Sequence, residues 1–130
     1  YRFKKVGELR YLTLTFPPLP QDTEWFSIIE ECDMNCMAVY GICLDPEINE
    51  EINTCFSDID KGKLAEAISR FEILRQDIIP ESNPMLGSVY LNLISLYNDT
   101  DQPAKAESLI VEFNKLLVPF KQEFIKLLGK

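Results

Sequence analysis

The four cysteines offer this chain its widest choice of chemistry, and three of them fall within twelve residues, at Cys32, Cys36 and Cys43, before Cys55 follows. The gaps between them hold three, six and eleven residues. Zinc knuckles and thioredoxin-like redox sites use pairs separated by two residues, so neither motif is present. The spacing leaves three interpretations open: a disulfide staple, buried thiols, and a metal site, which is the least favoured.

The redox state of the cysteines depends on the compartment. If the protein is exported, Cys32 and Cys36 are the candidate disulfide, which would close a short turn. If it is cytosolic, all four are expected to be small buried apolar residues, and Cys55 falls on the inward stripe of a helix in either case. The chain begins at Tyr1 without a methionine, which indicates a trimmed product. We predict a periplasmic or secreted protein, with the cytoplasm as the alternative.

Catalytic machinery is sparse in the sequence. There is no histidine, which removes the commonest general base and the commonest metal ligand, and with them Ser-His and Cys-His nucleophile pairs. The segment from Asp58 to Gly62 is similar to the start of a calcium loop, but Ser69 stands where that loop ends in glutamate. The glycines are scattered singly and form no phosphate cradle. The sequence therefore predicts a protein that is not an enzyme, with no catalytic residue, no metal site and no cofactor.

The net charge of −8 is concentrated in the middle of the chain, where residues 25–62 carry nine acidic side chains and one basic. Such a field repels phosphate backbones and anionic membrane surfaces, so we expect no nucleic-acid partner. No apolar run is long enough to predict a membrane span. The expected partner is a protein or peptide, with a basic or apolar one favoured over an acidic one.

Residues 1–44 have the patterns of β-strands. The segments Phe3–Val6 and Leu9–Phe16 alternate around Gly7-Glu8 and predict a hairpin. Prolines at 17, 18 and 20 end the second strand, and alternation resumes over residues 38–44. The run Trp25–Ile29 fits either a strand or a helix, and we favour the strand because its neighbours on both sides are extended.

Helical periodicity begins at Asp45, where an N-cap acceptor precedes a proline at the first helical position. The first predicted helix ends at Lys61-Gly62, and the second spans residues 63–79. A third begins at Pro84, a fourth ends before Pro119, and a short amphipathic segment from Phe120 is predicted to cap the open end of the stack.

Two of these helix starts form an internal repeat at a spacing of 39 residues, each with a small residue where two helices can approach closely. The aligned pairs are Gly62 with Asp101, Ala67 with Ala106, and Phe71 with Ile110.

This repeat resembles the tetratricopeptide repeat, a hairpin of two helices with a large residue, leucine and tyrosine on the first helix. Residues 47–118 carry the resemblance, and the second copy matches well with Tyr90, Leu93 and Tyr97. The alternative is a generic helix bundle with the same apolar positions along its helices. The resemblance implies binding of an extended peptide or a partner helix along the face made by the first helix of each hairpin. The positions that it assigns to this groove are Asn53, Ser88, Asn92 and Ser95. Because neither first helix contains lysine or arginine, an acidic peptide would be repelled.

The N-terminal part, from Leu14 to Ile42, is similar to a segment of uncharacterised exported bacterial proteins, in which it would supply the last strands of a β-sandwich.

We therefore predict an α+β fold in two parts. Residues 1–44 form a small antiparallel sheet, possibly the end of a larger β-domain, and residues 45–130 form a tetratricopeptide-like stack with a capping helix. The predicted function is a non-catalytic protein or peptide interaction module. The alternatives are a structural accessory domain of a larger exported protein and, more distantly, an enzyme that uses Cys32 or Cys36.

Overall fold

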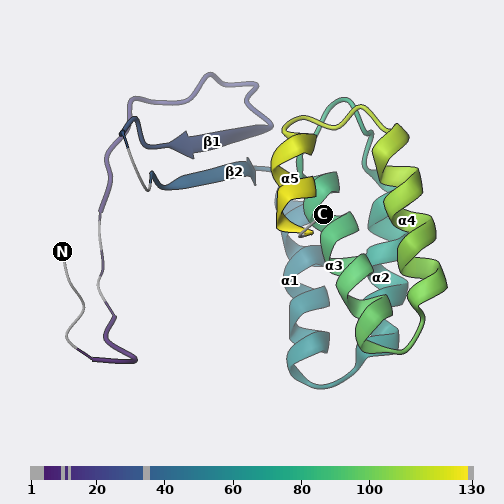
Figure 1. Ribbon diagram of the computed structural model, residues 1–130. Helices are drawn as coiled ribbons and strands as arrows, with labels where there is room; N and C mark the ends of the chain where they lie inside the picture. The colour runs from purple at the N-terminus through teal and green to yellow at the C-terminus, as the bar shows by residue number, and fades with distance from the viewer. Residues whose placement is uncertain (1–4, 10, 12, 34–35, 129–130) are drawn as a thin grey trace.

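A computed structural model describes residues 5–9, 11, 13–33 and 36–128. Within them, a two-stranded antiparallel sheet precedes five helices, so the α+β fold class predicted from the sequence is confirmed. Figure 1 shows the helices side by side, with the sheet projecting from one end of the helical layer. The elements in chain order are β1 (Trp25–Ile29), β2 (Ala38–Cys43), α1 (Pro46–Asp60), α2 (Leu64–Asp77), α3 (Met85–Asp99), α4 (Pro103–Lys115) and α5 (Lys121–Leu127).

The start of α1 follows directly from the local sequence. Asp45 caps the helix, with its Oδ1 accepting from the backbone N–H groups of Glu47 at 2.8 Å and Ile48 at 3.2 Å. Pro46 occupies the first helical position, where its missing N–H has no cost. Gly62, at φ +73°, follows the helix at its other end. The predicted boundaries of this helix are therefore confirmed.

The helical core runs through α1 to α5 as one cluster of buried apolar side chains. Consecutive helices from α1 to α4 contact one another, and α5 packs on α3. The two alanines at the repeat positions, Ala67 and Ala106, are both buried. The largest fully buried side chains include Phe71, Leu86, Tyr90, Leu93 and Phe113.

A polar network joins α2, α3 and α4 at the edge of this core. Arg75 binds the carboxylates of Glu72 and Glu112. The hydroxyl of Tyr90 donates to Glu112 Oε1 at 2.6 Å, and that of Tyr97 donates to Glu72 Oε1 at 2.8 Å. One guanidinium and two carboxylates therefore connect three helices, with each tyrosine satisfied by a charged acceptor.

Stability should fall at alkaline pH because three buried groups must remain protonated. Burial, with a hydrogen bond to a carboxylate, raises the pKa of Tyr90 and of Tyr97 from 10 to about 12, and burial raises that of the Cys55 thiol from 9 to about 11. A folded-state pKa above the unfolded one gives stability that is present below the unfolded value and lost as pH rises toward the folded value. We expect unfolding by urea to become easier from about pH 9 to about pH 12. A Cys55→Ala variant should flatten the first part of that decline, and an unchanged profile would contradict this assignment.

The sheet pairs β1 with β2 in the register Trp25 to Cys43 and Ile29 to Ala38, with a bulge between Phe26 and Ile28. The strand interpretation of Trp25–Ile29 is thus confirmed over the helical one. β2 ends one residue before the predicted Leu44.

The hairpin predicted for residues 3–16 is wrong in the described residues. A turn does form where Gly7-Glu8 predicted one, with Gly7 at φ +79° and the N–H of Glu8 donating to the carbonyl of Lys5. Neither 5–9 nor 13–16 is a strand, however. Phe3, Lys4, Arg10 and Leu12, which belong to the two predicted strands, lie outside the described residues.

The predicted hairpin does not form because its alternating side chains have no surface against which to pack. Tyr11 is 93% exposed, Phe16 55% and Leu14 47%. Two isolated strands are marginally stable in water unless one face packs on something else. Figure 1 shows the described residues before position 20 standing apart from the helices.

The sheet is attached to the helices by aromatic side chains. The ring of Phe120, just before α5, lies 5.7 Å from that of Trp25 and 5.0 Å from that of Tyr40. Trp25 Nε1 also donates to the carbonyl of Ser82 at 2.8 Å. Both strands therefore contact the link before α3 and the residue that precedes α5.

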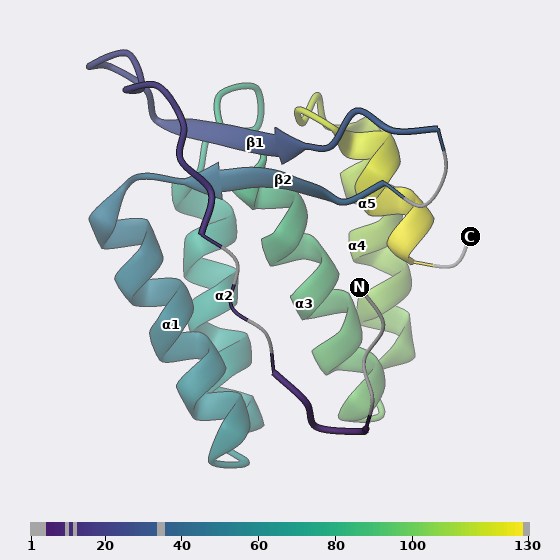
Figure 2. The same ribbon diagram turned by 90° about the vertical axis from the view of Figure 1, so that its left-hand side faces the viewer.

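A close backbone approach completes this attachment. Gly41 in β2 has φ +65°, and a Cβ at that position would lie 2.7 Å from Pro84 Cγ. Beside it, Asn49 Nδ2 of α1 donates to the carbonyl of Cys43 at 2.9 Å. Figure 2 shows the sheet across the ends of α1 and α3, with the length of both helices continuing beyond it.

Candidate functional site

The cysteines are structural in the described residues. Cys32 and Cys36 form a disulfide with an S–S distance of 2.01 Å, which confirms this pair as the predicted candidate. It crosslinks the connection between β1 and β2 at an exposed position. Cys43 and Cys55 are free and buried. At Cys55, burial raises the pKa and so favours the inert thiol over the reactive thiolate.

Across residues 5–9, 11, 13–33 and 36–128, no group of three or more histidine, cysteine, aspartate or glutamate side chains is arranged to hold a metal ion. In the same residues no helix is both long and apolar enough to cross a membrane.

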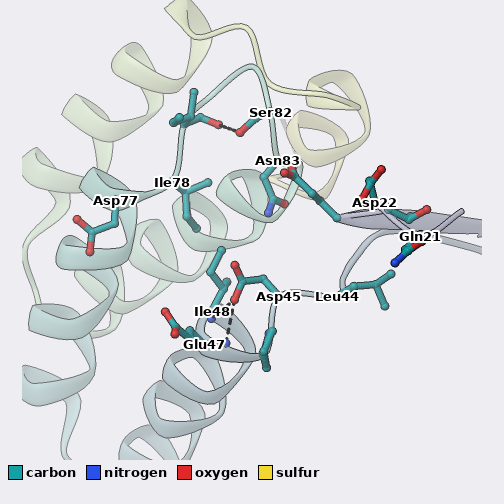
Figure 3. A pocket seen from close by; sticks show the side chains of 14 residues that line it. Gln21, Asp22, Leu44, Asp45, Glu47, Ile48, Asp77, Ile78, Ser82 and Asn83 are labelled. Atoms are coloured by element: carbon teal, nitrogen blue, oxygen red, sulfur yellow. Dashed lines mark hydrogen bonds between the residues drawn. The ribbon is translucent and has the colours of Figure 1, made fainter.

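A cavity of about 730 Å³ lies where the sheet meets the helices. Its wall is made by three segments that are distant in sequence: the residues before β1, the junction between β2 and α1, and the end of α2 with the link that follows. Figure 3 shows side chains from all three segments around it. The lining residues are Gln21, Asp22, Thr23, Glu24, Leu44, Asp45, Pro46, Glu47, Ile48, Asp77, Ile78, Ile79, Ser82 and Asn83.

The charge of this cavity has one sign. Its lining includes five carboxylates, Asp22, Glu24, Asp45, Glu47 and Asp77, and no lysine or arginine among the described residues. All five side chains are exposed. Asp45 is engaged as the cap of α1, whereas the other four make no ion pair within the described part of the chain. We refer to this feature as the acidic cavity.

Buried side chains form the floor of the acidic cavity. Asn83 is buried, and its Oδ1 accepts from the backbone N–H of Met85 at 2.9 Å, which fixes the link at the start of α3. Its Nδ2 approaches Cys43 Sγ at 3.8 Å. Ile78 is buried beside it and provides apolar surface. The cavity therefore combines apolar surface on its floor with five carboxylates that are open to solvent.

The site residues implied by the tetratricopeptide resemblance lie elsewhere. Asn53 is exposed on α1, and Ser88, Asn92 and Ser95 share one face of α3. Asn92 Nδ2 donates to the carbonyl of Ser88 at 2.8 Å, so this amide is partly occupied within the helix. None of the four residues lines the acidic cavity.

Ser95 instead lines a second cavity of about 570 Å³, formed by α3, α4 and the end of α5. Its other lining residues are Leu91, Ile94, Asn98, Pro103, Ala106, Glu107, Ile110, Leu127 and Leu128. Of the four predicted groove residues, Ser95 is the one that lines this second cavity.

Sequence reasoning missed most of the acidic cavity. The acidic bias of residues 25–62 includes Asp45 and Glu47, but Asp22 and Asp77 lie outside that range. They reach the same cavity because the sheet packs against the link between α2 and α3, and no periodicity in the sequence predicts that contact.

Comparison with known proteins gives no relative: no family model, no curated protein and no solved structure matches this chain.

Proposed function

We propose that this protein is a non-catalytic interaction module that binds a basic segment of a partner protein in the acidic cavity. The observation that carries the proposal is the set of five carboxylates around about 730 Å³ with no cation in the described wall. A lysine or arginine side chain entering the cavity would meet several carboxylates, and an acidic segment would be repelled.

The apolar floor adds a second requirement for the ligand. Leu44 and Ile79 are exposed at the cavity, with Ile78 buried beneath. Because single exposed ion pairs contribute little, a purely charged ligand would bind weakly. A segment that alternates basic and apolar side chains can use both surfaces. The proposed partner is therefore a basic protein or peptide with apolar anchors.

The helical repeat supports a scaffold role. Two helix hairpins, α1–α2 and α3–α4, stack with buried alanines at the equivalent positions 67 and 106. This arrangement supports the proposal that the helices are tetratricopeptide-like. We also propose a periplasmic or secreted location, with which the disulfide between Cys32 and Cys36 is weakly consistent.

A structural accessory domain of a larger exported protein is the second candidate. It is favoured by the exposed apolar side chains of the N-terminal segment, such as Tyr11 and Phe16, which resemble the surface of a sheet that lacks a covering layer.

The first candidate is tested with two synthetic peptides, one alternating lysine with leucine and one with glutamate in place of lysine. In fluorescence anisotropy at low salt, the lysine peptide should bind and the glutamate peptide should not. A variant carrying Asp22→Asn, Glu24→Gln and Asp77→Asn should bind the lysine peptide about ten-fold more weakly, because it loses three favourable charge contacts.

The matched control removes the same charge from other exposed positions, as Asp60→Asn, Glu66→Gln and Asp99→Asn. This control should bind like the unmodified protein. Equal loss in both variants would assign the binding to the overall net charge and reject the acidic cavity as the site. Absence of binding by the lysine peptide would reject the proposed function itself.

A further inference from the structure

The outer edge of β1 is open to a further strand. The sheet of the described residues contains β1 and β2 alone, and β2 approaches the helices through the contact of Gly41 with Pro84. β1 has the sequence Trp-Phe-Ser-Ile-Ile, without the lysine, proline or inward-pointing charge that usually protects a free edge. The irregularity of the ladder lies opposite Ser27, where β2 supplies the extra residue, so β1 itself has no bulge to protect its free edge.

Backbone hydrogen bonds show which groups point outward. The N–H of Leu44 donates to the carbonyl of Glu24, and the N–H of Glu30 donates to the carbonyl of Met37, both at 2.8 Å. In an antiparallel ladder, such residues alternate with residues whose N–H and C=O point to the other edge. The neighbours Trp25 and Ile29 therefore direct their backbone groups away from β2, where an added strand could bind them.

The chain also contains a strand-like segment that has no sheet. Thr13, Leu14, Thr15 and Phe16 alternate polar and apolar, and all four are exposed. β-branched and aromatic residues in alternation have a high β propensity. Figure 1 shows this segment away from both the sheet and the helices.

Prolines explain why the segment does not pair with β1 of its own chain. Residues 17, 18 and 20 are prolines, which hold φ near −65° and favour an extended polyproline geometry over a tight reversal. The next turn comes only after them, where the N–H of Thr23 donates to the carbonyl of Pro20 at 3.2 Å. The stiff stretch of residues 17–20 therefore directs residues 13–16 away from their own sheet, where a second molecule can bind them.

Charge complementarity selects a second copy as the occupant. The donor segment is preceded by Lys5 and Arg10, and β1 is followed by Glu30 and Glu31. In an antiparallel pairing, the N-terminal end of the donor lies beside the C-terminal end of the acceptor. The basic residues of one chain would then meet the acidic residues of the other.

We propose that two copies of this chain form a twofold dimer in which residues 13–16 of each add antiparallel to the outer edge of β1 in the other. The exchange is reciprocal, so the same contact forms twice and closes the assembly. It continues the existing β1–β2 ladder and covers the exposed Leu14 and Phe16. Neither residues 13–16 nor β1 line the acidic cavity, and the dimer does not depend on the proposed function.

The test compares two double variants by sedimentation velocity over a range of protein concentrations. Thr13→Pro with Thr15→Pro introduces two residues that lack an N–H and disfavour a central strand, so the dimer should weaken at least about ten-fold. Thr13→Val with Thr15→Val keeps both N–H groups and raises β propensity, so the dimer should persist or tighten.

Amide hydrogen exchange reports the location of the contact. The N–H groups of Trp25 and Ile29 should be protected in the unmodified dimer and should lose that protection in the proline variant. Leu14→Lys is a second disrupting variant, which serves if the proline variant does not fold. A chain that stays monomeric at millimolar concentration, or a dimer that survives both disrupting variants, would overturn the proposal.

Discussion

Replacing Arg75 with alanine should lower the free energy of unfolding by about 2 to 4 kcal/mol, because it removes the shared cation from a partly buried network. Arg75 contacts Glu72 of its own helix and Glu112 of α4. Without it, the carboxylates keep only the hydrogen bonds from Tyr90 and Tyr97 and lose their compensating charge. Urea unfolding monitored by circular dichroism measures the change.

Two further substitutions make this expectation specific. Arg75→Lys keeps the charge but loses the planar fork that reaches both glutamates, so it should recover only part of the lost stability. Lys126→Ala breaks an exposed ion pair with Glu123 on α5 and should change stability by less than about 1 kcal/mol. Similar losses for Arg75→Ala and Lys126→Ala would show that the network is not a major source of stability.

Replacing Gly87 with alanine should displace α5 from α3. A Cβ at this position would collide with the ring of Phe124, which is only 6% exposed. Loss of this buried aromatic contact should cost about 3 kcal/mol, the lower end of the range for removing a buried phenylalanine. Because Phe120 precedes α5 and contacts both strands, we also expect the indole fluorescence of Trp25 to shift toward that of a solvated side chain.

The double variant Gly87→Ala with Phe124→Leu provides the control for this prediction. A smaller side chain at position 124 makes room for the added methyl, so the pair should be more stable than Gly87→Ala alone. Gly62→Ala has open space around its Cβ and should show only the backbone cost of φ +73°, about 1 kcal/mol. If Gly87→Ala unfolds like the native chain, the packing of α5 on α3 is looser than described.

Local signals predicted the helices well, and they failed where long-range contacts decide the structure. The cap at Asp45 and the glycine at 62 set the ends of α1 because both act within a few residues. The alternation at residues 13–16 predicted a strand, but a strand also needs a partner, and alternation carries no information about one. Residues 13–16 therefore have the local sequence of a strand, but in the described residues no neighbouring strand pairs with them.

The polar network and the acidic cavity could not be predicted from the sequence, because they also depend on long-range packing. Arg75 and Glu112 are 37 residues apart in the sequence. They meet because α2 and α4 both pack on α3. The acidic cavity likewise depends on Asp22 and Asp77 lining one cavity from segments that are distant in sequence. The acidic composition predicted the sign of the charge, and the packing of the sheet determined where it is concentrated.

The spacing of the repeat leaves room for a long link between the two helix hairpins. At 39 residues from Gly62 to Asp101, it is about five longer than the usual tetratricopeptide unit. The link after α2 supplies Ile78, Ile79, Ser82 and Asn83 to the acidic cavity, and Ser82 also accepts the hydrogen bond from Trp25. The link between the two hairpins thus forms both the contact surface for the sheet and part of the wall of the acidic cavity. Shortening this link should remove both while leaving the helix pairs able to stack, so the contact surface for the sheet and the helical core can be altered separately.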